Sequence, residues 1–296
     1  MMLNLFAFVK RSVIWRKRNL SAELLNGSRL AQRVRSQIRK KLKKLTFTPG
    51  LAVVQVGTDP ASTLYIKHKQ RDCEKVHFHS EVHRLPADIT QESLVQQIEM
   101  LNTRSDIHGM LVQMPLPDHI DNEAVIDTIV PHKDADGLNP VNLGNLLINR
   151  EGVTPCTPTG IIRLIELTGE KIEGRHAVCI GRSPLVGKPV GLMLLNRNAT
   201  VTYCHSRTVD LRVEAQKADI LVVAIGKSEF ITADMVKPGA TVIDVGINHV
   251  DGRAVGDVKF EEVKEVAGFI TPVPGGVGPM TRAMLLENTL KLAIGG

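Results

Sequence analysis

The chain has 296 residues, 43% of them hydrophobic, so it can bury a sizeable core, and its length favours two domains. Aromatic residues make up only 3%, so we expect an aliphatic core, and no apolar run is long enough to span a membrane. The formal net charge of +6 suits an enzyme with anionic ligands and does not require a nucleic-acid partner.

The first residues combine an apolar start, residues 1–9, with a basic stretch, residues 10–18. A secretory signal has the opposite order, with the charge first. A mitochondrial transit peptide stays open as an alternative, because such peptides are rich in arginine and poor in acids, and it would place the protein in the matrix. We favour a third interpretation, in which residues 1–20 are an extension of uncertain role on a cytoplasmic protein that folds from near Ser21.

The first expected helix covers residues 22–45 and carries a second basic run at its end. This run lies on the polar face of the helix, opposite an apolar face that includes Val34 and Ile38. A solvated helix face therefore explains the run better than a nucleic-acid site does.

Strands and helices then alternate. We expect strands at residues 51–56, 81–85 and 109–112, helices at 59–76, 91–102 and 124–129, and a loop rich in Asp and Gly at 133–138. The second half is expected to contain helices at residues 157–169, 188–196 and 282–292 and strands at 176–180, 200–204, 220–225 and 241–245.

This alternation predicts an α/β fold with parallel strands covered by helices on both faces. Ligands of such sheets bind at the carboxyl ends of the strands. The residues found at those ends are Gln113, Gly181, His205, Gly226 and Gly246.

Residues 177–187 form a predicted strand, a glycine turn and the start of a helix. Backbone amides at a helix start attract a pyrophosphate. Ser183 stands where the G-x-G-x-x-G pattern has its second glycine, so this loop alone fits an ordinary turn equally well. The next strand favours a cofactor site, because Ser206 and Arg207 follow it and no acid lies within residues 203–208. A hydroxyl and a cation there suit the 2′-phosphate of NADP.

Tyr65 and Lys69 are four residues apart and share one helix face. A desolvated lysine has a lowered pKa and can transfer protons. Gln113 is a candidate to orient the amine, and Asp136 is a candidate to bind an amino-substituted ring. On spacing alone, an exposed lysine and a solvated aspartate loop are the commoner arrangement.

Cysteine and histidine residues raise two further questions. Cys73, His77, His79 and His83 have side chains that suit zinc, but they cross a helix end into a strand, so we predict no metal site. The cysteines have no close pairing, and we expect all of them to be reduced, as in a cytosolic or matrix protein. They are Cys73, Cys156, Cys179 and Cys204.

Together these pieces resemble one family, the bifunctional methylenetetrahydrofolate dehydrogenase and methenyltetrahydrofolate cyclohydrolase. The resemblance runs in the family's order from about Leu25 to the end, and its last stretch is highly specific. The matching stretches are Asp59-Pro60-Ala61-Ser62 with Tyr65 and Lys69, Val112-Gln113-Met114-Pro115-Leu116, Lys133-Asp134-Ala135-Asp136-Gly137, Gly181-Arg182-Ser183 with Val186-Gly187 and Pro189, Val245-Gly246-Ile247-Asn248, and Pro272-Val273-Pro274-Gly275-Gly276-Val277-Gly278-Pro279-Met280-Thr281.

The resemblance implies two α/β domains with the active site in the cleft between them. Residues 21–144, completed by a C-terminal helix at 276–296, would form the catalytic folate-binding domain. Residues 145–275 would form a Rossmann-like NADP-binding domain. The family also implies a homodimer joined mainly through the cofactor domains, with a small-molecule folate as substrate and neither nucleic acid nor membrane as partner.

The resemblance also assigns roles to residues. Lys69 looks like the general acid/base of the cyclohydrolase step, Tyr65 like the aromatic that stacks on the folate, and Gln113 like the residue that holds Lys69. Asp136 would bind the pterin ring. Further substrate contacts match Pro274, Gly275 and Gly276. The positions that match cofactor contacts are Gly181, Arg182, Ser183, Ser206 and Ile247.

The implied activity is NADP-dependent oxidation of methylenetetrahydrofolate to the methenyl form, followed by hydrolysis to formyltetrahydrofolate without a metal. A monofunctional dehydrogenase of the same fold is one alternative, against which the retained Lys69 and Gln113 argue. A non-catalytic nucleotide- or RNA-binding protein is another, and it predicts binding that survives substitution of Lys69. One departure concerns His77, where many members have glycine after the lysine helix, in a left-handed conformation that is costly for other residues.

Overall fold

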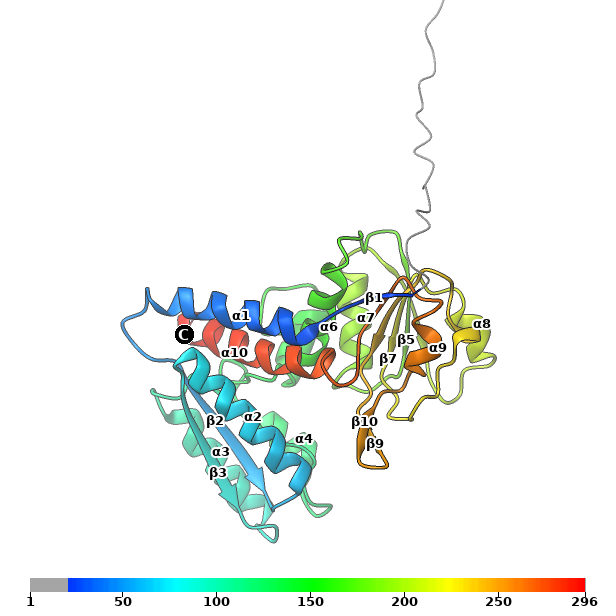
Figure 1. Ribbon diagram of the computed structural model, residues 1–296. Helices are drawn as coiled ribbons and strands as arrows, with labels where there is room; N and C mark the ends of the chain where they lie inside the picture. Colours follow the sequence, from blue (N-terminus) through cyan, green and yellow to red (C-terminus); the bar gives the residue numbers. More distant parts are fainter. Residues whose placement is uncertain (1–20, 296) are drawn as a thin grey trace, which may run out of the picture.

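The computed structural model describes residues 21–295 and contains two α/β units connected by long helices (Figure 1). The two interpretations of residues 1–20, extension and transit peptide, concern a segment outside the described residues. Across residues 21–295, no helix combines the length and the apolar character needed to cross a membrane. The predicted α/β class with two domains is confirmed.

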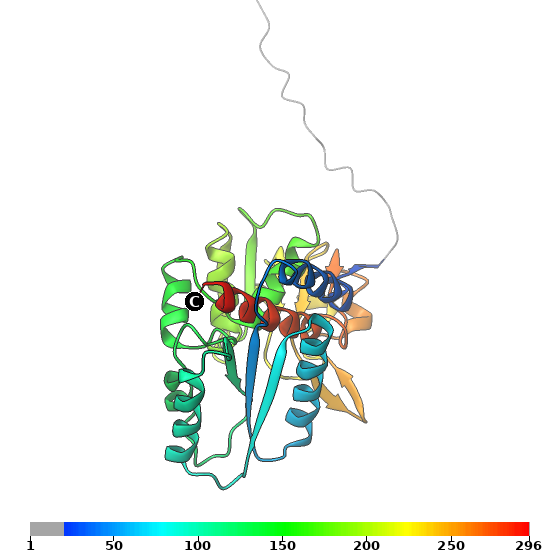
Figure 2. The same cartoon turned by 90° about the vertical axis from the view of Figure 1, so that its left-hand side faces the viewer.

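The first unit has a three-stranded parallel sheet with the order β3-β2-β4. Its elements are β2 (Gly50–Val56), α2 (Pro60–Val76), β3 (His79–Leu85), α3 (Gln91–Thr103), β4 (Gly109–Val112), α4 (Asn122–Thr128) and α5 (Pro140–Leu147). Successive residues of β2 point to opposite faces of the sheet. Val53 belongs to the same hydrophobic cluster as Ile66 of α2, and Val54 belongs to the same cluster as Leu94 of α3. Helices α2 and α3 accordingly cover opposite faces of the sheet (Figure 2).

The second unit has a six-stranded parallel sheet with the order β1-β11-β8-β7-β5-β6. Its strands are β1 (Glu23–Leu24), β5 (His176–Ile180), β6 (Thr200–Cys204), β7 (Ile220–Val223), β8 (Thr241–Asp244) and β11 (Phe269–Ile270). Its helices are α6 (Cys156–Glu166), α7 (Gly187–Leu195), α8 (Leu211–Ala215), η1 (Ala233–Met235) and α9 (Phe260–Val263). Helices α6 and α7 share one core cluster and α8 and α9 another, so helices cover both faces, as predicted.

The start of the fold differs from the prediction. Helix α1 (Gly27–Leu42) does not begin at residue 22, because Asn26 caps it by accepting the N–H of Arg29 at 2.9 Å. Residues 23–24 instead form β1, which pairs with β11 in the six-stranded sheet. This short segment, assigned from the sequence to the first domain, therefore adds a strand to the second unit.

A hairpin was also missed by the sequence analysis. It consists of β9 (Asn248–Val250) and β10 (Arg253–Val255), which are antiparallel. Asp251 and Gly252 connect them, with φ angles of 49° and 75°. An Asp-Gly pair with two positive φ angles is the turn that best matches the twist of a two-residue hairpin, so the sequence did carry this signal.

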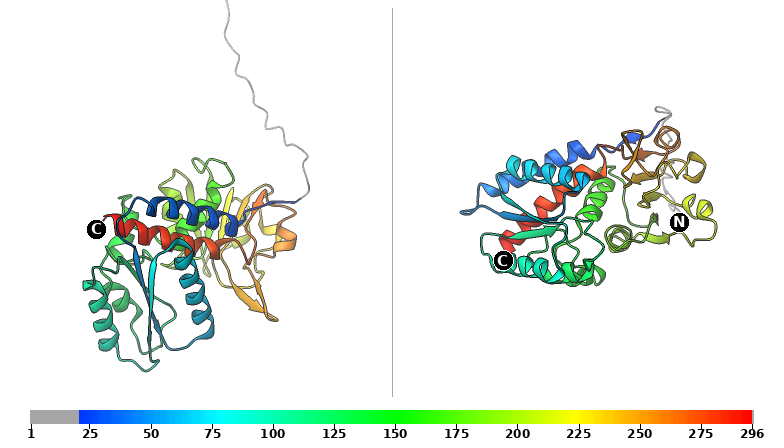
Figure 3. Two further views of the ribbon diagram at one scale, coloured as in Figure 1. Left: turned by 60° about the vertical axis from the view of Figure 1, so that its left-hand side comes forward. Right: turned by 90° about the horizontal axis from the view of Figure 1, so that it is seen from below.

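Helix α10 (Val277–Gly295) connects the two units. It lies beside α1 in every view, and it also packs against α6, α2 and β4 (Figures 1 and 3). Helix α10 begins earlier than the expected residue 282 and takes in the second half of the Pro272–Thr281 stretch, which leaves residues 272–276 as a loop. Its contacts with elements of both units place that loop at their junction.

Candidate active site

Lys69 lies in the middle of α2 with 6% of its surface exposed. The helix begins at Pro60 because Asp59 accepts the N–H of Ser62 at 2.7 Å. The Nζ of Lys69 donates to Oε1 of Gln113, just beyond β4, at 2.9 Å. Burial lowers the pKa of Lys69, although the carboxylate of Asp136 opposes this effect. The buried amine is therefore closer to neutral than an exposed lysine, as a proton carrier requires.

Gln113 is itself held in one orientation. Its Nε2 donates to the carbonyl of Met114 at 2.8 Å, which leaves Oε1 facing Lys69. The peptide bond from Met114 to Pro115 is cis. The predicted pairing of Gln113 with Lys69 agrees with this geometry.

Tyr65 lies one turn before Lys69, with the lysine Nζ 5.3 Å from its ring centroid. Burial raises the pKa of Tyr65 to about 12, with Arg282 opposing the shift. The phenol therefore stays protonated at neutral pH. Its ring remains available as an apolar surface beside the amine.

A pocket of about 210 Å³ brings these residues together. Its lining comes from both units, because Leu185 and Val186 precede α7 whereas Lys69 belongs to α2. The full lining is Tyr65, Lys69, Val112, Gln113, Met114, Asp136, Leu138, Pro155, Cys156, Thr157, Leu185, Val186 and Thr281. The predicted set of Lys69, Tyr65, Gln113 and Asp136 thus shares one pocket at the junction of the units.

The loop that carries Asp136 is held by its neighbour Asp134. Asp134 is buried and accepts the N–H groups of Gly137 at 2.9 Å and Asn139 at 2.8 Å, as well as the amide of Asn142 at 2.9 Å. These bonds tie Asp134 into the protein, so Asp136, which is half-buried, is the aspartate left to face the pocket.

Cys156 is a pocket residue to which sequence reasoning gave no role. Its Sγ donates to the carbonyl of Ala135 at 3.2 Å, and Asn288 donates to the same carbonyl at 3.0 Å. Burial raises the pKa of Cys156 well above its usual value, so it remains a thiol. All four cysteines are free and buried. Nothing in the residue pattern marked this position.

Arg282 was also missed, because it comes after the Pro272–Thr281 stretch and belongs to no motif of its own. Its guanidinium carbon lies 5.9 Å from the centroid of the Tyr65 ring. Its Nε donates to Oδ2 of Asp72, which is 3% exposed, at 2.8 Å. Arg35 of α1 lies 3.6 Å from the other Asp72 oxygen, so this carboxylate connects α1, α2 and α10.

Replacement of Asp72 by asparagine is expected to lower the free energy of unfolding by about 3 kcal/mol, because two partly buried arginines lose their counter-charge. Burial raises the pKa of Asp72, but Arg282, Arg35 and Lys75 outweigh it and hold this pKa below its ordinary value of 3.8. A depressed folded-state pKa contributes stability above the unfolded pKa and loses it as the pH falls through the folded pKa. Denaturant unfolding should therefore show a lower free energy of unfolding for Asp72→Asn than for wild type at pH 7. This difference should disappear as the pH falls below about 3 to 4. The same difference in the free energy of unfolding at pH 7 and at about pH 2 would contradict this account.

The predicted cofactor loop follows β5. Gly181 has a φ of 121°, and a Cβ there would lie 2.2 Å from the carbonyl oxygen of Ala224. Gly187, which begins α7, would place a Cβ 2.2 Å from the carbonyl oxygen of Gly181. Ser183 accepts the N–H of Val186 at 3.2 Å through its Oγ. Only glycine fits at both ends of this turn, so the turn is compact, and residues 182–185 between the two glycines are exposed.

The other predicted cofactor residues lie in this loop or follow other strands of the same sheet. Arg182, Ser206 and Arg207 are exposed, the last two directly after β6, which is paired with β5. Ile247 follows β8 and is 56% exposed. These residues therefore belong to one edge of the six-stranded sheet, at the carboxyl ends of its strands.

Pro274, Gly275 and Gly276 are placed differently from the predicted catalytic set. In the described part of the chain, none of the three lines the pocket that contains Lys69. The carbonyl of Gly275 accepts the N–H of Ser28 at 3.0 Å, and a Cβ at Gly27 would lie 1.8 Å from the Gly276 oxygen. The loop thus packs closely on the start of α1, and substrate contact by these three residues remains a prediction.

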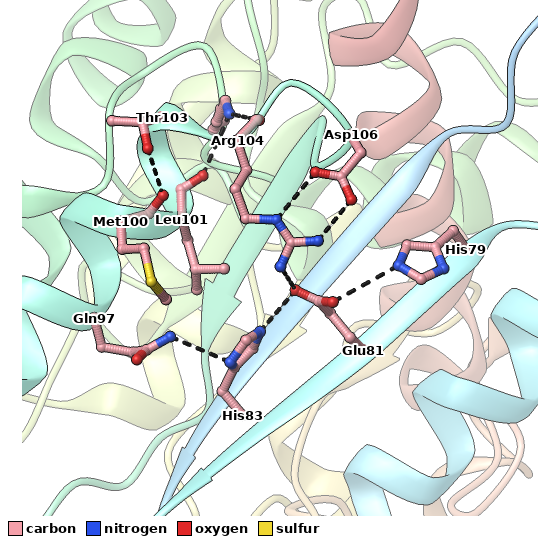
Figure 4. Close-up of polar contacts among 10 residues, drawn as sticks. His79, Glu81, His83, Gln97, Met100, Leu101, Thr103, Arg104 and Asp106 are labelled. Carbon is pink, nitrogen blue, oxygen red and sulfur yellow. Dashed lines mark hydrogen bonds and ion pairs between the residues drawn. The ribbon is translucent and has the colours of Figure 1, made fainter.

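The residues considered as a zinc set do not converge. Cys73 is buried, while His79 and His83 lie beside Glu81 on the edge strand β3, with His83 Nε2 at 2.7 Å from the carboxylate (Figure 4). His77 ends α2 with φ 61° and ψ 37°, the left-handed conformation expected at this position. Within residues 21–295, no group of three or more His, Cys, Asp or Glu side chains has a metal-binding arrangement.

A buried lysine in a pocket that both units of a parallel α/β fold line is the arrangement of a two-domain α/β enzyme. Residues 25–136 match the sequence model of the tetrahydrofolate dehydrogenase/cyclohydrolase catalytic domain, and residues 155–295 match that of the corresponding NAD(P)-binding domain. The chain belongs to the tetrahydrofolate dehydrogenase/cyclohydrolase family. The resemblance drawn from the sequence motifs is confirmed.

Individual relatives agree with this assignment. The bifunctional protein FolD of Moorella thermoacetica is 54% identical over 278 residues, which cover 93% of this chain and 99% of the relative. The crystal structure of the bifunctional FolD dehydrogenase/cyclohydrolase of Campylobacter jejuni has a TM-score of 0.91 at 45% identity, covering 93% of this chain and 99% of that one. The Trypanosoma brucei enzyme, solved with NADP and an inhibitor, has a TM-score of 0.88 at 36% identity, with 93% and 98% covered.

Proposed function

We propose that this protein oxidises methylenetetrahydrofolate to methenyltetrahydrofolate with NADP and then hydrolyses the product to formyltetrahydrofolate. The observation that carries the proposal is the buried Lys69 amine, 2.9 Å from Gln113 Oε1. That amine lies beside the Tyr65 ring, in a pocket whose lining comes from both units. The pairing of Lys69 with Gln113 argues against a monofunctional dehydrogenase.

In the hydrolytic step, Lys69 moves the protons. Water adds to the methenyl carbon and loses a proton, and one ring nitrogen must gain a proton as the ring opens. An amine with a lowered pKa performs both transfers, and Gln113 keeps it directed at one place by accepting one of its hydrogens. Tyr65 holds the folate by stacking, and Asp136 accepts hydrogens from the amino-substituted ring.

The residues after β5 and β6 fit an NADP molecule. When bound, NADP accepts the hydride from the one-carbon bridge of the folate. The compact turn at Gly181, with the exposed residues Arg182 and Ser183 between it and the start of α7, is where a pyrophosphate would bind. Arg182, Ser206 and Arg207 are exposed beside that turn, and no carboxylate follows β6 within residues 203–208 to repel a 2′-phosphate.

Replacement of Arg182 by alanine should weaken NADP more than NAD. The expected difference is about 1 to 3 kcal/mol, the usual range for a lost hydrogen bond to a charged group. The measurement is kcat/KM with each cofactor at saturating folate. A wild-type preference for NAD, or an equal loss with both cofactors, would contradict the assignment of the 2′-phosphate to this end of the sheet.

The hydrolytic activity is tested with methenyltetrahydrofolate alone. Its absorbance should fall faster with the protein than in buffer, with no nicotinamide cofactor present. A monofunctional dehydrogenase would leave the rate at the buffer value while still reducing NADP in a separate reaction. A nucleotide- or RNA-binding protein without catalysis would do neither.

The domain limits, assembly and location belong to the same proposal. Residues 21–144 with 276–296 bind the folate, and residues 145–275 bind NADP, with β1 added to the sheet of the second domain. The protein is a homodimer joined through the cofactor domains, which is supported by the edge position of β6 and the 38% exposure of Tyr203 on it. Relatives at 50% to 54% identity are bacterial, so we place the protein in the cytoplasm, without nucleic-acid or membrane partners.

A further inference from the structure

Two aspartates of the second unit are buried without an obvious catalytic use. Asp244 ends β8 and is 3% exposed, and Asp257 follows β10 and is 0% exposed. In the described part of the chain, the hydrogen-bond partners of both carboxylates are backbone N–H groups and one side-chain amide, with no cation among them. Buried carboxylates that bind backbone hold loops in place.

Asp257 holds the loop that follows β7. Its Oδ2 accepts the N–H of Ile225 at 2.7 Å and that of Gly226 at 2.9 Å. Its Oδ1 accepts the side-chain amide of Asn248, the first residue of β9, at 3.0 Å. One carboxylate therefore joins the end of β7 to the start of the hairpin.

Asp244 holds Asp257 in turn. Its Oδ1 accepts the N–H groups of Asp257 at 2.9 Å and Gly246 at 3.0 Å, and its Oδ2 accepts that of Val258 at 3.0 Å. A Cβ at Gly246 would lie 2.2 Å from Oδ1 of Asp257. The glycine after β8 is thus required by the approach of this carboxylate.

The position of these loops in the sheet indicates what they hold. The strand order β8-β7-β5-β6 puts the pyrophosphate loop after β5, with Ser206 and Arg207 after β6 on one side. The loops held by Asp257 follow β7 and β8 on the other side, where Ile247 is exposed. A dinucleotide with its pyrophosphate at β5 and its 2′-phosphate at β6 directs its nicotinamide half toward β7 and β8.

We propose that Asp257, held in place by Asp244, is the positioning residue for the nicotinamide half of the cofactor. Neither aspartate touches the cofactor, and both act through the loops after β7 and β8. The inference rests on the proposed NADP-dependent function and adds to it the residue that orients the reacting ring.

The test compares Asp257→Asn with wild type by calorimetric titration of two probes, NADPH and adenosine 2′,5′-bisphosphate. The asparagine has one acceptor oxygen, so the N–H groups of the β7 loop or the Asn248 amide lose their partner. NADPH affinity should fall about 10-fold, the size of one lost charged hydrogen bond. The bisphosphate lacks the nicotinamide half, so its affinity should stay at the wild-type value.

Kinetics on the same preparations add a second readout. The kcat of the dehydrogenase should fall about 100-fold in Asp257→Asn, as for a misplaced reactant, while methenyl hydrolysis without cofactor stays at the wild-type rate. Asp219→Asn is the matched control. Asp219 also accepts a backbone N–H, that of His176 at 3.0 Å, but at the opposite, amino end of the strands. This control should bind both probes normally.

Two results would overturn the proposal. One is an unchanged NADPH affinity in Asp257→Asn. The other is an equal loss of affinity for NADPH and for the bisphosphate, which indicates a general structural role. If Asp257→Asn does not fold, Asn248→Leu takes its place in the titrations. It removes one hydrogen-bond donor to the Asp257 carboxylate, so it should lower the affinity for NADPH and leave that for the bisphosphate unchanged. A wild-type protein that binds NADPH but oxidises no folate would contradict the proposed function, and the two-probe comparison would still decide the role of Asp257.

Discussion

Replacement of Lys69 by methionine is expected to lower the cyclohydrolase rate by at least about 100-fold, the lower range for a lost general acid/base. Methionine fills much of the same buried space beside Tyr65 but carries no titratable group. Hydride transfer needs no acid or base at this point, so the dehydrogenase should survive in part. Methenyltetrahydrofolate should therefore accumulate with the variant and not with wild type.

Lys67→Met provides the matched control for this experiment. Lys67 lies on the same helix two residues earlier and is exposed, so its loss should change neither activity. If Lys69→Met hydrolyses the methenyl compound at the wild-type rate, Lys69 is not the proton carrier. If both activities disappear while folate still binds, the proposed separation of the two steps fails.

Replacement of Gly181 by alanine should remove NADP binding and lower the free energy of unfolding by about 3 kcal/mol or more. Two costs add: strain at a φ of 121° and a Cβ placed 2.2 Å from the Ala224 carbonyl oxygen. The loop can relieve the contact only by moving the start of α7, where the pyrophosphate is expected. Denaturant unfolding and NADP titration measure the two effects.

Gly169→Ala separates strain from crowding. Gly169 also has a positive φ, 74°, but a Cβ there meets nothing within 4 Å. This variant should lose only about 1 kcal/mol, the cost of a left-handed alanine, and should bind NADP normally. If both variants lost the same free energy of unfolding and the same NADP affinity, the close contact at Gly181 would not be the cause.

Most of the fold could be predicted from the sequence because its strands are buried and apolar. Strands β2 and β5, for example, begin within one residue of their expected positions, since each is a short apolar run ended by glycine. The shared helix face of Tyr65 and Lys69 and the strand end at Gln113 also followed from spacing. Their convergence with Asp136 in one pocket did not, because the sequence places them on separate elements.

The features that were missed depend on long-range contacts. β1 and β11 are two residues each and exist only because they pair with one another and with β8. The helix propensity of residues 22–26 was overridden by that pairing and by the Asn26 cap. Arg282 and Asp257 carry no local pattern, since their roles come from partners at Asp72 and Ile225, 210 and 32 residues away. Such roles become visible only in three dimensions.

The central claim, a single protein with both activities, is tested most directly by one absorbance experiment. Purified protein is mixed with methylenetetrahydrofolate and either NADP or NAD, and the nicotinamide and methenyl absorbances are recorded together. We predict rapid reduction of NADP, slower reduction of NAD, and a methenyl signal that stays well below the amount of NADPH formed, because hydrolysis consumes it. No reduction of either cofactor, or a methenyl signal that rises in step with NADPH and does not decay, would contradict the account.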